Sequence, residues 1–305
     1  MLRAALLYGG ANLVSVVLIV VANKVILGTL GFRFPICLTW LHSAVTWAGL
    51  QAMARGGVFE PQHVPLQHSL PIAAAYTGFI AFSNISIHIN TVGFFQITKI
   101  ICTPAVAAAE YVLYGKPVGA QKAGAIAVLV LGICVATATD SAVASNLPGC
   151  LVAAAQVVSS VMYAVWAGYK QKQLGVSANA LLHQVSPLAV LLLAALVAAL
   201  EPVGWRARDP ASILGYDYTP RAVGWIGLSS VLGLAVTLST YLFIGATSPT
   251  TYSVVGNLKT LCILAAGMLL FGDELSLKKG AGLVCAMAGI VWYSRAELQA
   301  QATKT

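Results

Sequence analysis

Two lysines lie inside apolar segments of this chain of 305 residues. Lys99 and Lys259 each stand about a third of the way along a stretch of roughly 20 apolar residues, the length at which a helix crosses a bilayer. A charge near the centre of a membrane is costly, so it normally faces a wet cavity or a partner. Glu110, a carboxylate in the same segment as Lys99, lies well over two helical turns away. A divalent anion such as phosphate would stabilise both cations, whereas the competing interpretation has them pointing into opposite aqueous vestibules as structural residues.

Polar side chains accompany both lysines along the chain. Gln96 and Thr103 lie three residues before and four residues after Lys99, so all three share one helical face. Tyr252 lies two turns before Lys259, where a planar group could rest against its ring. The residues predicted to bind the ligand are Lys99, Lys259, Thr260, Ser83, Tyr252, Asn257, Gln96, Lys24 and Asn84. The alternative is that the small polar side chains serve helix packing and that Lys24, at the end of its segment, reaches the headgroups.

The sequence contains no arrangement of residues that would catalyse a covalent step. Its apolar segments hold no pair of carboxylates, and its six cysteines form no CxxC pair, so neither a disulfide framework nor a zinc site is indicated. His63, His68 and Asp273 fall in different predicted loops, whereas a membrane-bound transferase would gather such residues at the interface. His42 is predicted to be a hydrogen-bonded contact between helices. We therefore predict no enzyme activity, no metal and no cofactor.

The composition is that of a membrane protein. Hydrophobic residues make up 59% of the chain and charged residues only 9%, and the mean hydropathy is +0.85. Soluble domains carry about a quarter charged residues, so a soluble enzyme, a nucleic-acid-binding module and a disordered chain are excluded. The formal net charge of +8 comes from lysines and arginines at the ends of apolar runs, where they fit loops and lipid headgroups.

Ten apolar segments predict an all-α polytopic membrane protein with a single transmembrane domain over residues 1–305. The predicted spans are 6–28, 35–54, 69–88, 92–114, 120–139, 147–170, 179–200, 221–244, 247–271 and 278–294. An even number of spans places both termini on one side of the membrane. A slight excess of lysine and arginine on that side favours cytosolic termini.

An internal repeat divides these spans into two sets of five. At a separation of 157 residues, Tyr114-Gly115, Gln121-Lys122 and Leu131-Gly132 correspond to Phe271-Gly272, Lys278-Lys279 and Ala288-Gly289. Lys99 and Lys259 correspond at a separation of 160. Because five is odd, the second repeat (147–305) enters the membrane the opposite way round from the first (1–140). Such inverted repeats are typical of secondary transporters, which bind substrate between the repeats near the bilayer midplane.

These motifs resemble the triose-phosphate/nucleotide-sugar branch of the drug/metabolite transporter superfamily. Asn23-Lys24 and Leu38–His42 look like the first hairpin of that branch, Thr91–Lys99 looks like its fourth helix, and Thr247–Thr260 looks like its ninth. The likeness runs over nearly the whole chain. In plastid phosphate translocators the ninth-helix lysine is followed by arginine, but here Thr260 follows Lys259. That pair is similar to the Lys-Thr subgroup, whose members mostly carry UDP-sugars.

The resemblance implies a nucleotide-sugar antiporter that imports a UDP-sugar into the Golgi lumen in exchange for UMP. In such a site Lys99 and Lys259 hold the phosphates, Thr260 and Ser83 donate hydrogen bonds, and Tyr252 packs against the base or the sugar. The endoplasmic reticulum and the plastid envelope are the other locations that this branch allows. The Gly/Ala-rich helix faces suit packing within one chain as well as contacts in a homodimer, so both stay open.

Two alternatives to this function remain. Within the branch, the alternative is a plastid sugar-phosphate/phosphate exchanger, against which Ile80 and Val236 stand where the plastid members have a histidine and a tyrosine. From another class, a membrane scaffold that transports nothing would have no use for lysines at the midplane. Substituting both Lys99 and Lys259 would leave its function intact.

Overall fold

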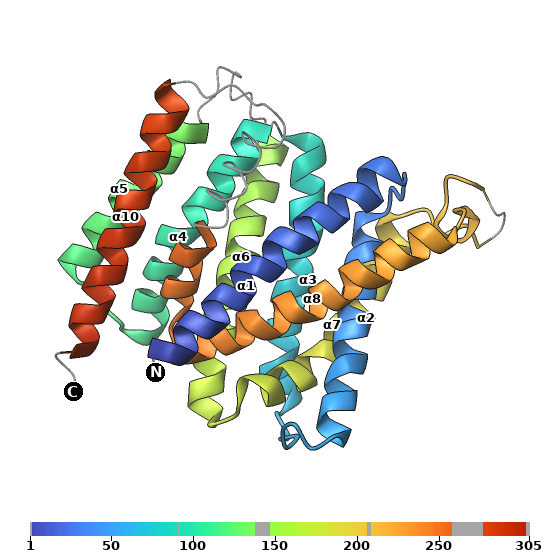
Figure 1. The fold of residues 1–305 in the computed structure, drawn as a ribbon, viewed down its shortest axis with the longest axis horizontal. Coiled ribbons are helices and arrows are strands. Elements are labelled where there is room, and N and C mark those ends of the chain that lie inside the picture. Colours follow the sequence, from blue (N-terminus) through green and yellow to red (C-terminus); the bar gives the residue numbers. More distant parts are fainter. Residues whose placement is uncertain (1, 91, 138–146, 206–208, 258–276, 303–305) are drawn as a thin grey trace. The chain divides into compact units, whose positions relative to one another are not determined.

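The computed structural model describes residues 2–90, 92–137, 147–205, 209–257 and 277–302, and these residues form helices and connections without any strand (Figure 1). The helices are α1 (Leu2–Lys24), α2 (Pro35–Arg55), α3 (Leu66–Ile89), α4 (Val92–Tyr114), α5 (Ala120–Thr137), α6 (Leu147–Leu174), α7 (Ala178–Leu200), α8 (Pro220–Ala246) and α10 (Leu277–Ala302). Residues 249–257 are also helical, and α1 continues into a π-helical turn over Val25–Thr29. The all-α class is thus confirmed for the described residues.

Most of the predicted boundaries agree with these helices to within a few residues. The exceptions are α1, which already begins at Leu2, and α10, which continues to Ala302. The predicted span 247–271 is described only as far as residue 257, and the rest of it lies outside the described residues. By length and composition, four described helices could cross a membrane: residues 3–29, α6, α7 and α8. Ten membrane spans remain a prediction.

The chain folds into two compact units. Unit 1 contains residues 1–84 and 166–248, and unit 2 contains residues 85–165 and 249–305. Each unit combines helices from both predicted five-helix repeats, 1–140 and 147–305. The equivalence of these repeats, and a single transmembrane domain, stay predictions at this point.

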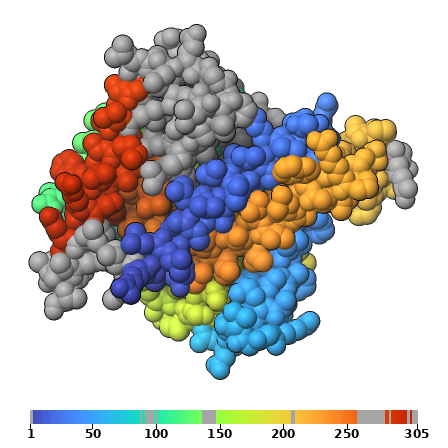
Figure 2. Space-filling model, viewed as in Figure 1, coloured from blue at the N-terminus to red at the C-terminus, as the bar shows by residue number. Residues whose placement is uncertain are grey.

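In unit 1, α1 packs along α8, and Figure 2 shows the two helices side by side on one face. Their outward side chains include large exposed apolar residues, among them Leu7 on α1 and Val231 on α8. Between the helices, the buried Asn12 donates hydrogen bonds to Ser239 Oγ at 2.9 Å and to Thr240 Oγ1 at 3.0 Å. An apolar outer surface with paired polar groups inside is what a lipid environment requires.

A second polar contact joins three helices of unit 1. The hydroxyl of Ser229 on α8 donates to Asn23 Oδ1 on α1 at 2.6 Å, and its oxygen lies 2.9 Å from Nε2 of His42 on α2. Since the hydroxyl proton is given to Asn23, Nε2 of His42 is the donor in the second bond. The prediction that His42 is a hydrogen-bonded contact between helices is confirmed.

Glu201, the residue directly after α7, caps the N-terminus of α2. Its Oε1 accepts a hydrogen bond from the backbone N–H of Ile36 at 2.7 Å, and its Oε2 accepts one from Cys37 at 2.8 Å. Pro35 occupies the start of α2 and has no N–H to satisfy. The carboxylate thus pairs two donors that a helix start leaves open, where the helix dipole also favours negative charge. Burial raises the pKa of Glu201, and the two backbone hydrogen bonds partly oppose this shift.

The stretch after Glu201 packs against the turn between α1 and α2. The buried ring of Phe32 meets the ring of Phe34 edge-on at 5.2 Å and that of Tyr216 at 5.1 Å. The hydroxyl of Tyr216 donates to the carbonyl of Leu30 at 2.9 Å. A stretch whose polarity marks it only as a connection therefore contributes to the core of unit 1.

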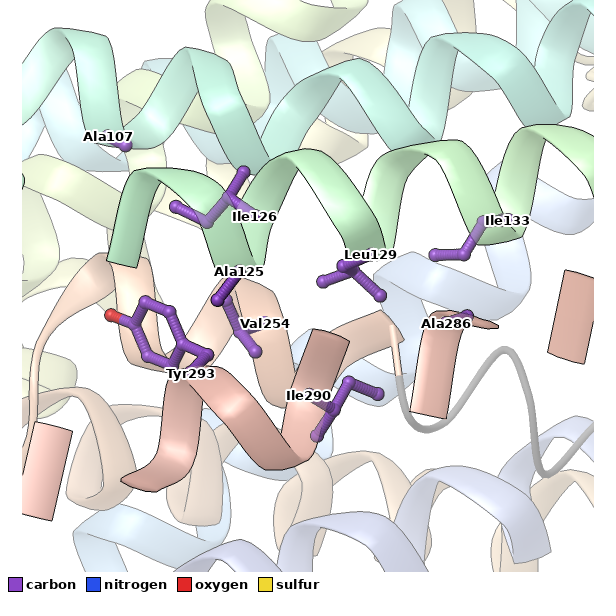
Figure 3. Packing of buried hydrophobic residues seen from close by; sticks show 9 residues of the cluster. All are labelled: Ala107, Ala125, Ile126, Leu129, Ile133, Val254, Ala286, Ile290 and Tyr293. Atoms are coloured by element: carbon purple, nitrogen blue, oxygen red, sulfur yellow. The ribbon is translucent and has the colours of Figure 1, made fainter. Parts of the chain in front are cut away.

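In unit 2, α5 and α10 pack backbone to backbone (Figure 3). A Cβ built on Gly132 of α5 would overlap the backbone of Ala286 on α10, and one built on Gly289 would lie 2.8 Å from the Cα of Leu129. Glycine therefore permits this close approach at both positions. The buried cluster around the contact consists of Ala107, Ala125, Ile126, Leu129, Ile133, Val254, Ala286, Ile290 and Tyr293.

We expect Gly132→Ala to destabilise the protein by about 1–3 kcal/mol, because the added methyl group has no space between the helices. Gly280→Ala, on α10, is the matched control, since a Cβ there meets nothing within 4 Å. It should leave stability unchanged or raise it by up to about 1 kcal/mol. Thermal unfolding of both purified variants in detergent measures the difference, and equal unfolding temperatures would contradict the described contact.

Removal of the cap in Glu201→Ala should lower the stability of the protein by about 1–2 kcal/mol, as losing other helix N-caps does.

Because its pKa is raised in the folded protein, Glu201 contributes most to stability below the pKa of a free glutamate, and this contribution decreases as pH rises through the folded-state pKa. Unfolding temperatures measured from about pH 4 to about pH 8 should therefore fall more in the wild type than in Glu201→Gln, which does not titrate. A steeper fall in Glu201→Gln would refute this assignment.

Candidate functional site

Helix α4 and the helical segment 249–257 are joined by buried hydrogen bonds in unit 2. Asn257 Nδ2 donates to Thr103 Oγ1 at 2.7 Å, and the hydroxyls of Thr103 and Ser253 lie 3.0 Å apart. Thr103 is 1% exposed and Asn257 is 8% exposed, so these bonds are shielded from solvent. The predicted site residue Asn257 therefore lies against the α4 face that Thr103 shares with Lys99.

Glu110 joins α4 and the helical segment 249–257 at the other end of their contact. Its Oε2 accepts hydrogen bonds from the backbone N–H of Thr250, at 3.1 Å, and from the Thr250 hydroxyl, while its Oε1 forms an ion pair with Lys116 at 2.9 Å. Since Pro249 opens the helical segment, Glu110 caps a helix start, as Glu201 does in unit 1. The α4 contacts at Thr103 and Glu110 run in the opposite order to their partners at Asn257 and Thr250, so the two helices are antiparallel.

Lys99 lies one turn before Thr103 on α4, and its side chain is exposed. Glu110 is 11 residues further along the helix, about 16 Å at 1.5 Å per residue. Both oxygens of Glu110 are also engaged by other groups, so this carboxylate does not compensate the charge of Lys99. The prediction that Glu110 lies well over two helical turns from Lys99 is confirmed.

Three predicted site residues belong to unit 1. Ser83 and Asn84 lie on α3, and Lys24, exposed, is the last residue of α1. Asn84 Nδ2 donates to the carbonyl of Ile80 in its own helix at 2.9 Å. The Ser83 hydroxyl is buried and has no hydrogen-bond partner in the structure. A ligand-binding role for these three residues stays a prediction.

The remaining predicted residues are only partly covered by the structure. Lys259 and Thr260 lie outside the described residues, and for Gln96 the structure describes the helical backbone alone. Tyr252 is half-buried in the helical segment 249–257. This segment precedes Lys259 in the sequence by two residues.

Sequence reasoning missed one buried polar residue of unit 2, Gln156 on α6. Its side chain is fully buried, and neither atom of its amide has a hydrogen-bond partner in the structure. One turn later on the same helix, the side chain of Ser160 lies beside the thiol of Cys102 on α4. The signal for Gln156 in the sequence is a single glutamine inside an apolar, alanine- and valine-rich run.

The chain was compared with known families, proteins and structures. The profile of the Triose-phosphate Transporter family matches residues 3–294. Similar proteins of Arabidopsis thaliana include "Nucleotide-sugar uncharacterized transporter 2", 34% identical over 93% of this chain and 70% of the relative, and "UDP-xylose transporter 2", 32% identical over 96% and 82%. "UDP-rhamnose/UDP-galactose transporter 2" is 33% identical over 95% and 82%. One solved crystal structure with 14% sequence identity has the same fold, with a TM-score of 0.71 over 96% of this chain and 98% of that chain.

We expect Thr103→Val to lower the stability of the protein by about 1–3 kcal/mol, because it leaves the buried amide of Asn257 without its acceptor. Thr46→Val is the control: Thr46 is also buried, but its hydroxyl bonds only to the carbonyl of His42 in its own helix, so less should be lost. Adding Asn257→Leu to Thr103→Val should recover part of the loss, since both partners are then apolar. Thermal unfolding of the variants tests this, and an additive double variant would argue against the contact.

Proposed function

Since the chain belongs to the Triose-phosphate Transporter family, we propose that it is a nucleotide-sugar antiporter, which imports a UDP-sugar in exchange for UMP by alternating access. The names of its relatives support this substrate class, since they include transporters of UDP-xylose and of UDP-rhamnose and UDP-galactose. The Golgi membrane is the proposed location, with both termini in the cytosol. A UDP-sugar, UMP and membrane lipid are the proposed partners, and two copies of the chain as a homodimer are compatible with this function.

The observation that carries the proposal is the hydrogen bond between Asn257 and Thr103. Lys259 follows Asn257 by two residues, so the two Cα atoms are at most about 7 Å apart in any chain conformation. Lys99 lies one turn from Thr103, about 5–6 Å along α4. One lysine lies a turn from this hydrogen-bonded pair and the other follows it by two residues in the sequence, and together they would suit a phosphate or diphosphate group, which accepts several charge-assisted hydrogen bonds.

Other predicted residues complete the proposed site. Thr260 and Ser83 offer hydroxyls, and Gln96 and Asn84 offer amides. Tyr252 offers a ring on which a base or sugar can pack. Lys24 adds a third positive charge. Their contribution is a proposal that rests on sequence position, on the family, and on the buried Ser83 hydroxyl that has no protein partner in the structure.

The inverted repeat is part of the proposal, and the contact between α5 and α10 supports it. Gly132 packs on Ala286, and Leu129 packs on Gly289. At the repeat distance of 157 residues, Gly132 corresponds to Gly289 and Leu129 corresponds to Ala286. Each of the two contacts is therefore the repeat equivalent of the other. Cys285 Sγ donates to the carbonyl of Val128. The two residues are also 157 positions apart, so Cys285 bonds to its own equivalent in the other repeat. Reciprocal contacts of this kind are expected around a two-fold axis that relates two repeats.

Exchange assays in proteoliposomes test the function. Vesicles preloaded with UMP should take up a UDP-sugar, whereas vesicles loaded with inorganic phosphate should not take up triose phosphate. The opposite pattern would favour the sugar-phosphate/phosphate exchanger, and a folded protein without any uptake would favour a scaffold.

We expect Lys99→Gln and Lys259→Gln each to reduce the exchange rate about 10- to 100-fold, since a hydrogen bond to a charged group contributes about 1.5–3 kcal/mol. Lys170→Gln removes the same charge at the exposed end of α6, where Lys170 bonds to Gln173, and should exchange at the wild-type rate. Uptake of radiolabelled UDP-sugars into UMP-loaded vesicles provides the measurement. Wild-type exchange by both lysine variants would remove the anion site from the proposal.

A further inference from the structure

Gln156 is a buried polar side chain of unit 2 whose position no hydrogen bond in the described part of the chain explains. It is 0% exposed, and both Nε2 and Oε1 lack a hydrogen-bond partner in the structure. Most buried side-chain amides are hydrogen-bonded, since burying an unpaired one is unfavourable. A glutamine at such a position is stabilised only by a group that offers it both a donor and an acceptor.

Two contacts fix the level of Gln156 relative to α4. At the start of α6, the carbonyl of Gly149 accepts a hydrogen bond from Asn90 Nδ2 at 3.2 Å, and further along, the side chain of Ser160 lies beside the thiol of Cys102. The two contacts join residues separated by 59 and 58 positions, so α4 and α6 run in the same direction with matched levels.

The same offsets place Gln156 at the level of residues 97 and 98 of α4, one to two residues before Lys99. Cys102 Sγ, which lies beside Ser160 of α6, donates to the carbonyl of Thr98 one turn earlier at 3.6 Å, so this turn of α4 faces α6. Gln156 lies one turn before Ser160 and therefore on the same face of α6. The amide is thus on the helix next to α4, within two residues of the level of the lysine of the proposed phosphate site.

We propose that Gln156 binds the nucleotide-sugar directly, through paired hydrogen bonds to a neighbouring donor and acceptor of the ligand. The inference rests on the proposed function and specifies its binding site further. Nε2–H and Oε1 of a carboxamide lie side by side, and they match the N3–H and C4=O edge of uracil. Vicinal hydroxyls of the sugar present the same pattern. The two sources share one chemistry, and a ligand that lacks the sugar separates them.

The test uses Gln156→Met, which keeps the length of the side chain and removes its polar atoms. Binding of UMP and of a UDP-sugar to the purified protein is measured by calorimetry, together with the unfolding temperature of the ligand-free variant. We expect binding at least about tenfold weaker and an unfolding temperature equal to or above that of the wild type. Weaker binding of UMP identifies the base as the partner of Gln156, and unchanged UMP binding with weaker UDP-sugar binding identifies the sugar.

Gln171→Met is the matched control on the same helix. Gln171 is also buried, at 5% exposed, but its Nε2 donates to the carbonyl of Tyr241 at 3.3 Å. This substitution should lower the unfolding temperature and leave ligand binding unchanged. If Gln156→Met instead behaves like Gln171→Met, the proposal for Gln156 is overturned while the transport function stands. A wild-type protein that binds neither UMP nor any UDP-sugar would overturn both.

Discussion

The structure depends on the requirement that polar groups away from water be paired within the protein. The two helix starts at Pro35 and Pro249 show how strictly this requirement acts. Each has open backbone N–H groups, and each receives a carboxylate from a neighbouring helix: Glu201 for α2 and Glu110 for the helical segment 249–257. Both carboxylates lie near the C-terminal end of their own helices, so each cap closes one end of an antiparallel pair. The same requirement explains why the buried amide of Asn12 is hydrogen-bonded to Ser239 and Thr240.

Against this background, the charged groups inside apolar helices become informative. In unit 2 the pairing of Glu110 with Thr250 and Lys116 leaves no free carboxylate oxygen for Lys99, some 11 residues away. In a membrane protein a cation inside an apolar helix is a functional feature by default. The polar residues of the helical segment 249–257 support the same interpretation, because they hold α4 against the part of the chain that leads to Lys259.

Much of this fold could be predicted because it depends on local sequence. Apolar length, with punctuation such as Lys116-Pro117 and Ser248-Pro249, places most helix boundaries to within a few residues, and His42 could be assigned from its position alone. The caps could not be predicted, since Glu201 and Ile36 are 165 residues apart and nothing local marks them as partners. Gln156 was missed for a related reason: in an apolar helix a glutamine with a partner and one without look alike. For the site, Asn257 is placed beside α4, whereas Lys259 and Thr260 lie outside the described residues.

The two helix contacts of unit 2 differ in a way that bears on transport. Between α5 and α10 the backbones touch at glycines, and such packing of small residues gains its energy from close van der Waals contact, which any separation loses. Between α4 and the helical segment 249–257 the contact is made by hydrogen bonds of Thr103, Ser253 and Asn257, which a ligand rich in hydroxyls and phosphates can replace one for one. A ligand shifts a conformational equilibrium only through groups that it binds differently in the two states. Under the proposed function, the ligand binds at the polar pair and not at the glycine contact, so rearrangement on binding is expected at α4 and not at α5.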